Sequence, residues 1–164
     1  MSIRSLMLAA FLAVPSVGTT EDASPLLGVW KVQQIAVTGP RPSTISNPQP
    51  GYWVFTPGFY SIVMINSATP RPKFEGPSEP DSPTPEQKAA RYDQWSLFAA
   101  QAGSYKLQGT TVTARPLVAK NESVMTGPER TLDFQIEGKT LSLTLRPASG
   151  QAPIEIRWKL ERIE

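Results

Sequence analysis

The 164-residue chain contains no cysteine and no histidine. Without cysteine it has no disulfide, no thiolate zinc site and no cysteine nucleophile. Without histidine it also lacks the commonest general base and the commonest transition-metal ligand. We therefore expect no metal, no other cofactor and no catalytic residue. The composition favours a binding protein over an enzyme.

A strong excess of either charge is absent too. The chain has 16 Lys and Arg against 14 Asp and Glu, which gives a formal net charge of +2. The basic residues are scattered along the sequence, with no run of three. A nearly neutral chain has no electrostatic reason to bind nucleic acid or an anionic lipid surface. We expect neither as a partner.

The first eighteen residues have the pattern of a secretory signal peptide. Arg4 supplies a positive start, Leu6 to Val14 is uniformly apolar, and Ser16-Val17-Gly18 offers small residues for cleavage. Nine apolar residues are too few to cross a bilayer core of about 30 Å. The sequence therefore predicts a signal peptide over 1–18, a mature domain over 19–164 and a periplasmic or secreted protein with no stable membrane insertion.

Most of the mature chain alternates between apolar and polar residues, the period of a β-strand with one buried face. Gly58, Gly109 and Gly138 stand at three expected hairpin turns. The pattern predicts an all-β fold, an eight-stranded antiparallel up-and-down barrel, because eight strands can close around a small ligand. The expected strands are 27–37, 51–56, 59–66, 104–108, 110–118, 130–136, 139–146 and 154–162.

One segment has the period of a helix instead. Thr84, Pro85 and Gln87 form a helix-start pattern, and Tyr92, Trp95 and Ala99 share one face. The spacing predicts one amphipathic helix over 85–101, inserted between strands three and four. We expect Trp95 to pack into the core; a lid over the barrel mouth is the alternative. Proline-rich loops over 40–50 and 67–83 flank this part of the chain.

The Gly28-x-Trp30 pattern at the start of the first strand resembles the lipocalin signature. In that superfamily the Trp closes one end of the barrel and is covered by an Arg from the last strand. By alternation from Trp158, Arg162 matches that position. The resemblance thus implies a structural contact between Trp30 and Arg162 at a closed end.

The chain is more closely similar to bacterial exported lipocalin-like domain proteins. The matching segments are LLGVWKV, GYWVFTPGFYSIVMIN, TPRP, AGSYKL and TARPLVAKN, which span most of residues 26–162. Two features depart from the resemblance. Phe59 stands where family members often carry His, and typical lipocalins place their helix after strand eight. The resemblance implies a lipocalin-like barrel and leaves the function open.

The candidate site is the barrel interior. One parity of the strands would line it, including Val63, Phe134 and Trp158, with Tyr60, Tyr105 and Arg115 at the open end. Proline inside a strand marks an edge or a bulge, so Pro116 could turn Arg115, Lys120 and Asn121 toward the rim. The predicted ligand-binding residues are Tyr60, Val63, Tyr105, Arg115, Phe134 and Trp158.

These residues predict a monomer that binds a small hydrophobic or amphipathic molecule. Two alternatives remain open from the sequence. One is a barrel isomerase or cyclase, in which Tyr and Arg groups steer a reactive ligand. The other is a protein-binding, inhibitor-like module that uses loops 40–50 and 67–83. A core filled by side chains fits the same pattern as a cavity.

The signal-peptide assignment makes a direct prediction about processing. The mature protein should begin at Thr19 or within a few residues of it, because cleavage follows the small residues of Ser16-Val17-Gly18. N-terminal sequencing of protein recovered from the periplasm or medium measures this. An intact Met1 in that fraction would contradict the assignment.

Overall fold

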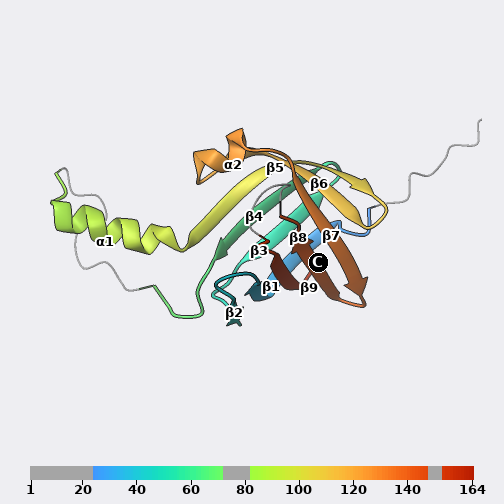
Figure 1. The fold of residues 1–164 in the computed structure, drawn as a ribbon, viewed down its shortest axis with the longest axis horizontal. Helices are drawn as coiled ribbons and strands as arrows, with labels where there is room; N and C mark the ends of the chain where they lie inside the picture. Colours follow the sequence, from blue (N-terminus) through green and yellow to red (C-terminus); the bar gives the residue numbers. More distant parts are fainter. Residues whose placement is uncertain (1–23, 72–81, 148–152) are drawn as a thin grey trace, which may run out of the picture.

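A computed structural model describes residues 24–71, 82–147 and 153–164, so the predicted signal peptide lies outside the described residues. Within these ranges the chain forms nine β-strands and two short helices (Figure 1). They are β1 (Gly28–Val37), β2 (Ser43–Ser46), β3 (Tyr52–Thr56), β4 (Phe59–Ile65), α1 (Pro85–Ser96), β5 (Phe98–Gln108), β6 (Thr111–Ala119), α2 (Glu122–Thr126), β7 (Arg130–Glu137), β8 (Thr140–Leu145) and β9 (Ile156–Arg162).

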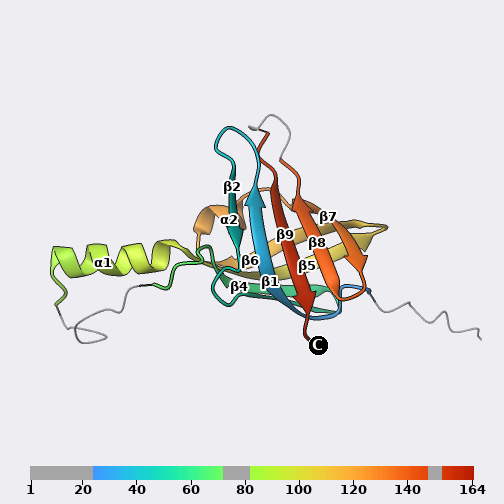
Figure 2. The ribbon, with the colours of Figure 1, turned by 90° about the horizontal axis from the view of Figure 1, so that it is seen from below.

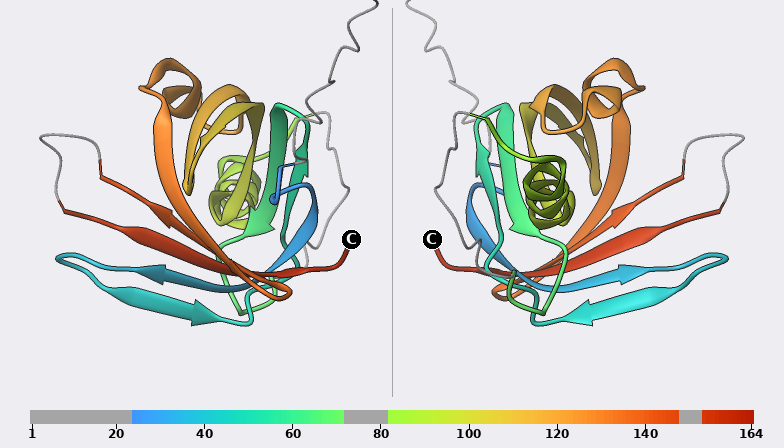
Figure 3. Two further views of the ribbon diagram at one scale, coloured as in Figure 1. Left: turned by 90° about the vertical axis from the view of Figure 1, so that its right-hand side faces the viewer. Right: turned by 90° about the vertical axis from the view of Figure 1, so that its left-hand side faces the viewer.

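Eight of the strands close into an antiparallel barrel. From β3 to β9 each strand pairs with the next one along the chain, and β1 pairs with both β3 and β9. The β1–β9 ladder runs from Trp30 opposite Arg162 to Val37 opposite Ile156. Seen end-on, the strands curve round a common interior (Figure 3). The predicted all-β, eight-stranded antiparallel barrel is confirmed.

The ninth strand, β2, was predicted to be loop. Because β3 pairs only with residues 28–31 of β1, the adjoining edge of residues 34–37 is free, and Ser43–Ser46 pairs there. Ile45 of β2 also packs against the core. Because β2 is an additional strand, the helix α1 lies after the fourth strand, β4, and before β5, and not between the third and fourth strands as predicted.

The start of α1 is as predicted, but its end is not. The Thr84 hydroxyl accepts from the backbone N–H of Gln87, whose side chain accepts from the backbone N–H of Thr84. The helix was expected to continue to residue 101 and stops at Ser96. Residues 98–101 pair with residues 62–65 of β4 instead. Pairing within the barrel overrides the helical preference of the alanines here.

The helix projects from the barrel rather than packing on it (Figures 1 and 2). None of its residues is buried. Trp95, expected in the core, is 54% exposed and packs edge-on against Phe98 with ring centroids 5.2 Å apart. In the part of the chain that is described, neither helix is long and apolar enough to cross a membrane.

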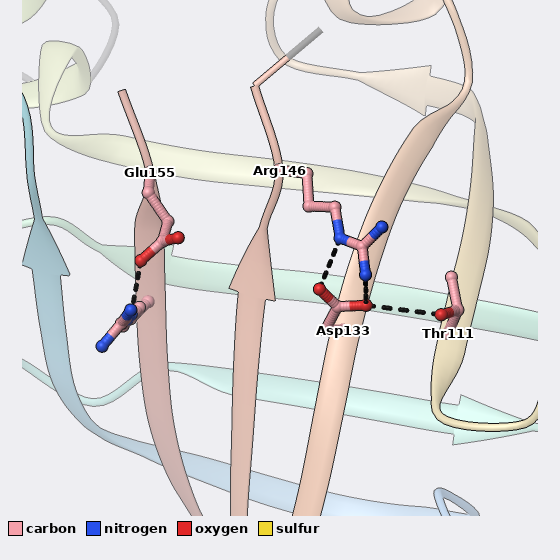
Figure 4. A network of polar contacts seen from close by, with 5 residues as sticks. Thr111, Asp133, Arg146 and Glu155 are labelled. Atoms are coloured by element: carbon pink, nitrogen blue, oxygen red, sulfur yellow. Dashed lines mark hydrogen bonds and ion pairs between the residues drawn. The ribbon is translucent and has the colours of Figure 1, made fainter. Parts of the chain in front are cut away.

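Alternation along β7, β8 and β9 separates an apolar inner face from a polar outer face. Leu132, Leu141, Leu143 and Leu160 are buried inside. On the outer face the Arg146 guanidinium donates to both oxygens of the Asp133 carboxylate, which also accepts from Thr111 (Figure 4). Glu155 and Arg157 form a second outer pair. Exposed pairs of this kind stabilise little, but they use up the charges of the outer face.

The expected contact at the closed end is present. Trp30 is fully buried, and the Arg162 guanidinium carbon lies 4.1 Å from its ring centroid. Arg162 also donates to the backbone carbonyls of Leu27 and Pro25, at 2.6 and 2.7 Å. The Trp30 indole N–H donates to the carbonyl of Leu26 at 2.7 Å. Together these bonds hold residues 25–27 across the end of the barrel.

Replacing Trp30 with alanine should therefore be costly. Losing a fully buried large aromatic lowers the free energy of unfolding by about 3–5 kcal/mol. Trp95→Ala is the matched control, and its expected loss is about 1 kcal/mol or less, because Trp95 is largely exposed. Denaturant unfolding of both variants measures the difference. Equal losses would show that Trp30 does not seal the barrel.

Candidate functional site

A cavity of about 280 Å³ opens at the end of the barrel opposite Trp30 and Arg162. It lies near the lower size limit of small-molecule sites. Its deeper wall is mainly apolar and comes from strands β3, β4, β6, β7, β8 and β9. The apolar residues of this deeper wall are Trp53, Phe55, Ile62, Met64, Val112, Ala114, Leu132, Leu143, Leu145 and Trp158. The interior is thus partly open rather than filled.

The mouth of the cavity carries polar side chains. They come from the end of β4, the end of α1, the first half of β5 and the segment that joins β6 to α2: Asn66, Ser96, Gln101, Lys120 and Asn121. The Lys120 ammonium donates to the backbone carbonyls of Trp95 and Phe98, the latter at 2.9 Å. This cation therefore ties the end of β6 to the start of β5 and fixes one edge of the mouth.

Arg130 and Tyr60 are the ionisable pair of the inner wall. Arg130, at the start of β7, is half-buried, and Tyr60, on β4, is buried. Burial raises the pKa of the Tyr60 phenol above its ordinary value of 10.0, and the positive charge of Arg130 lowers it by less. The phenol therefore stays protonated near neutral pH. It serves as a hydrogen-bond donor and not as a base.

Three buried polar atoms of the lining residues have no hydrogen-bond partner among the described residues. They are the indole nitrogens of Trp53 and Trp158 and the hydroxyl of Tyr60. Buried polar groups in proteins are almost always hydrogen-bonded, and each one left unbonded costs about 1–3 kcal/mol. Three in the wall of one cavity identify this wall as the candidate site.

Two of the six predicted ligand-binding residues, Tyr60 and Trp158, line the cavity. Tyr105 is buried nearer the closed end, edge-on to Phe55, and its hydroxyl donates to Ser24 Oγ. Phe134 is partly buried against the core, outside the residues that line the cavity. Their binding roles remain predictions.

Val63 and Arg115 need correction, because both side chains lie on the outer surface of the barrel. Val63 is 47% exposed, whereas its neighbours Ile62 and Met64 line the cavity. Both faces of its hairpin are apolar, so alternation did not identify the inner one. Arg115 precedes the bulge that Pro116 predicted, and is exposed. Beyond the bulge, Lys120 and Asn121 reach the mouth.

Trp53 and Arg130 are among the wall residues that the sequence-based prediction missed. Trp53 stands opposite Trp30 on the neighbouring strand and therefore shares its inward face. Arg130 has the same parity as Leu132, which points inward. A positive charge on an inward position at a strand end was the available clue.

No family model matches the chain, and no curated protein matches it. Among solved structures, a lipocalin-like protein from Bacteroides uniformis has 13% sequence identity and a TM-score of 0.43. A protein from Bacteroides eggerthii has 11% identity and a TM-score of 0.42. Each likeness covers 84% of this chain and 98% of the other. The barrel assignment rests on the strand pairings and not on these likenesses.

The unbonded hydroxyl of Tyr60 makes a prediction about stability. Tyr60→Phe should raise the free energy of unfolding by about 1 kcal/mol or more, because it removes a buried donor without a partner. The control is Tyr105→Phe, which should lower it by about 0.5 kcal/mol, since the Tyr105 hydroxyl is bonded to Ser24 at a long 3.4 Å. Urea unfolding compares the two. A destabilised Tyr60→Phe variant would show that the hydroxyl has a partner.

Proposed function

We propose that the protein binds one small hydrophobic or amphipathic molecule in the cavity of its barrel. The observation that carries this proposal is a partly open interior with apolar walls, sealed at one end by Trp30 and Arg162 and ringed by polar groups at the other. Apolar walls with a few placed polar groups are the usual make-up of small-molecule sites. All the lining residues come from one chain, so a monomer suffices.

The cavity volume limits the ligand. A site near the lower limit of the usual range accepts a short chain or a small ring system rather than a large lipid. Burying about 300 Å² of apolar ligand surface stabilises a complex by about 7 kcal/mol before association costs. Those costs leave micromolar affinity as the expected range. This suits a carrier that both takes up and releases its ligand.

The chemistry of the wall supports binding over catalysis. Among the described residues, no Asp or Glu lines the cavity, and the Tyr60 phenol is held in its protonated form. The wall therefore offers groups that hold a ligand, but no carboxylate or phenolate to remove a proton from it. Of the two proline-rich segments considered for a protein-binding module, 40–50 contains β2, and residues 72–81 of the segment 67–83 lie outside the described residues.

Export is the second part of the proposal, and it rests on the sequence pattern of residues 1–18. A small soluble binding domain behind a cleaved signal peptide would act in the periplasm or outside the cell. There it would take up its ligand from the surroundings without help from a metal or cofactor.

A neutral environment-sensitive dye, N-phenylnaphthylamine, tests the binding function. The parent chain should bind it saturably with micromolar affinity. Ala99→Phe should weaken that binding by about tenfold or more, because residue 99 faces inward at the mouth and an added ring occupies space the dye needs. Overpacking at this rim costs about 1–3 kcal/mol of stability, so the fold should survive.

The matched control is Ala102→Phe, at an outward position on the same strand that does not line the cavity. Its dye affinity should equal that of the parent chain. Fluorescence titration measures all three proteins, and circular dichroism checks their folds. Equal dye affinity in all three would show that the dye binds elsewhere, and absence of saturable binding by the parent chain would overturn the proposed function.

A further inference from the structure

In the described part of the chain, buried hydrogen-bond donors have partners at the closed end of the barrel and lack them in the wall of the cavity. At the closed end, the Trp30 indole N–H donates to Leu26 and the Tyr105 hydroxyl to Ser24. In the cavity wall, the corresponding groups of Trp53, Trp158 and Tyr60 have no partner among the described residues. These three side chains are only 3%, 8% and 5% exposed. These three buried groups without a hydrogen-bond partner therefore all lie in the wall of the cavity.

The three side chains belong to one continuous patch of wall. The ring centroids of Trp53 and Trp158 are 5.3 Å apart. Tyr60 lies diagonally across from Trp53 on the next strand, because Trp53 is paired with Ile62. An indole N–H can only donate, so Trp53 and Trp158 each lack an acceptor, and the protonated Tyr60 hydroxyl also has a hydrogen to donate.

The charges around the cavity have one sign. Lys120 and Arg130 line it, and no carboxylate does so within the described ranges. Lys120 is held by two backbone carbonyls, whereas Arg130 makes no ion pair with any described residue. The nearby acid on the same strand, Asp133, points outward and is occupied by Arg146 (Figure 4). The positive charge of Arg130 is therefore not paired with a described carboxylate and lies at the cavity wall.

We propose that the ligand is a small amphipathic anion, a carboxylate on a short apolar chain, whose oxygens accept hydrogen bonds from Trp53, Tyr60 and Trp158 beside the charge of Arg130. This rests on the proposed binding function and names its ligand class. A carboxylate has two oxygens with about four acceptor sites and no donor, so it matches three unbonded groups that each have a hydrogen to donate. An alcohol has a single oxygen and brings a further donor.

Entry of the carboxylate requires a local rearrangement. The three donor atoms are themselves covered by neighbouring atoms, so wall side chains must move before an oxygen reaches them. Met64 lines the same wall, and its flexible side chain can change rotamer at little cost. The backbone barrel does not need to open.

Nuclear magnetic resonance of the indole N–H groups tests the hydrogen bonds directly in the full chain. The protein has four tryptophans, so it gives four indole signals, each assigned by a Trp→Phe variant. Decanoate should shift the Trp53 and Trp158 signals downfield as new hydrogen bonds form. The Trp30 signal, already bonded to Leu26, and that of the exposed Trp95 should stay in place. Decanol should produce no such downfield shift.

Competition against N-phenylnaphthylamine measures the selectivity. Decanoate should displace the dye from the parent chain at roughly tenfold lower concentration than decanol, the effect of a hydrogen bond to a charged group. Tyr60→Phe and Arg130→Met should each remove most of this preference, when each competition is referred to that variant's own affinity for the dye. Tyr105→Phe, which alters a buried phenol outside the cavity lining, should keep the preference in full.

The outcomes separate the two proposals. If the parent chain does not bind the dye, the binding function itself fails. If it binds the dye but decanoate and decanol compete equally, with the Trp53 and Trp158 signals unmoved, the anion assignment is wrong and the binding function stands. A preference that survives both Tyr60→Phe and Arg130→Met would also overturn the anion site, because the charge would then be recognised elsewhere.

Discussion

The ladder between β1 and β9 is the constraint on which the rest of the molecule depends. It joins the first barrel strand to the last one along most of their lengths, and so turns a meander with two open edges into a closed barrel. Once closed, the inward parity of every strand is fixed. The ladder also sets Arg162 directly opposite Trp30, which places the guanidinium over the indole and lets it hold residues 25–27. The same ladder therefore both closes the barrel and positions the two residues that seal one of its ends.

Small side chains at two inward positions help to explain why the interior is only partly filled. Trp30, Leu26 and Leu160 are fully buried at the sealed end. Toward the mouth, the inward positions of β5 and β6 hold Ala99 and Ala114, which leave space beside Leu143 and Trp158. The partly open interior therefore follows in part from these two alanines.

The sequence predicted those features that depend on local pattern. Alternation identified the eight barrel strands, Gly109 and Gly138 marked turns at which the backbone does have positive φ, and parity matched Arg162 to Trp30. It failed where long-range pairing decided the outcome. Ser43–Ser46 became a strand because β3 leaves part of β1 uncovered, and residues 98–101 left the helix to pair with β4. At the site, the doubly apolar hairpin hid the inward face, and so Val63 was chosen in place of Ile62 and Met64.

The orphan donors give the site its physical character. Satisfying Trp53, Tyr60 and Trp158 internally would have required an acceptor in the wall, such as the pairs that the closed end provides for Trp30 and Tyr105. Instead the carboxylates of the neighbouring strands face outward, where Asp133 and Glu155 bind arginines. These carboxylate acceptors therefore lie on the outer surface, whereas the unbonded donors lie in the cavity wall with Arg130, and Lys120 is bonded at the mouth. Free energy lost by leaving these donors unbonded would be recovered when an acceptor binds, and under the proposed function this difference would favour anions over equally apolar neutral molecules.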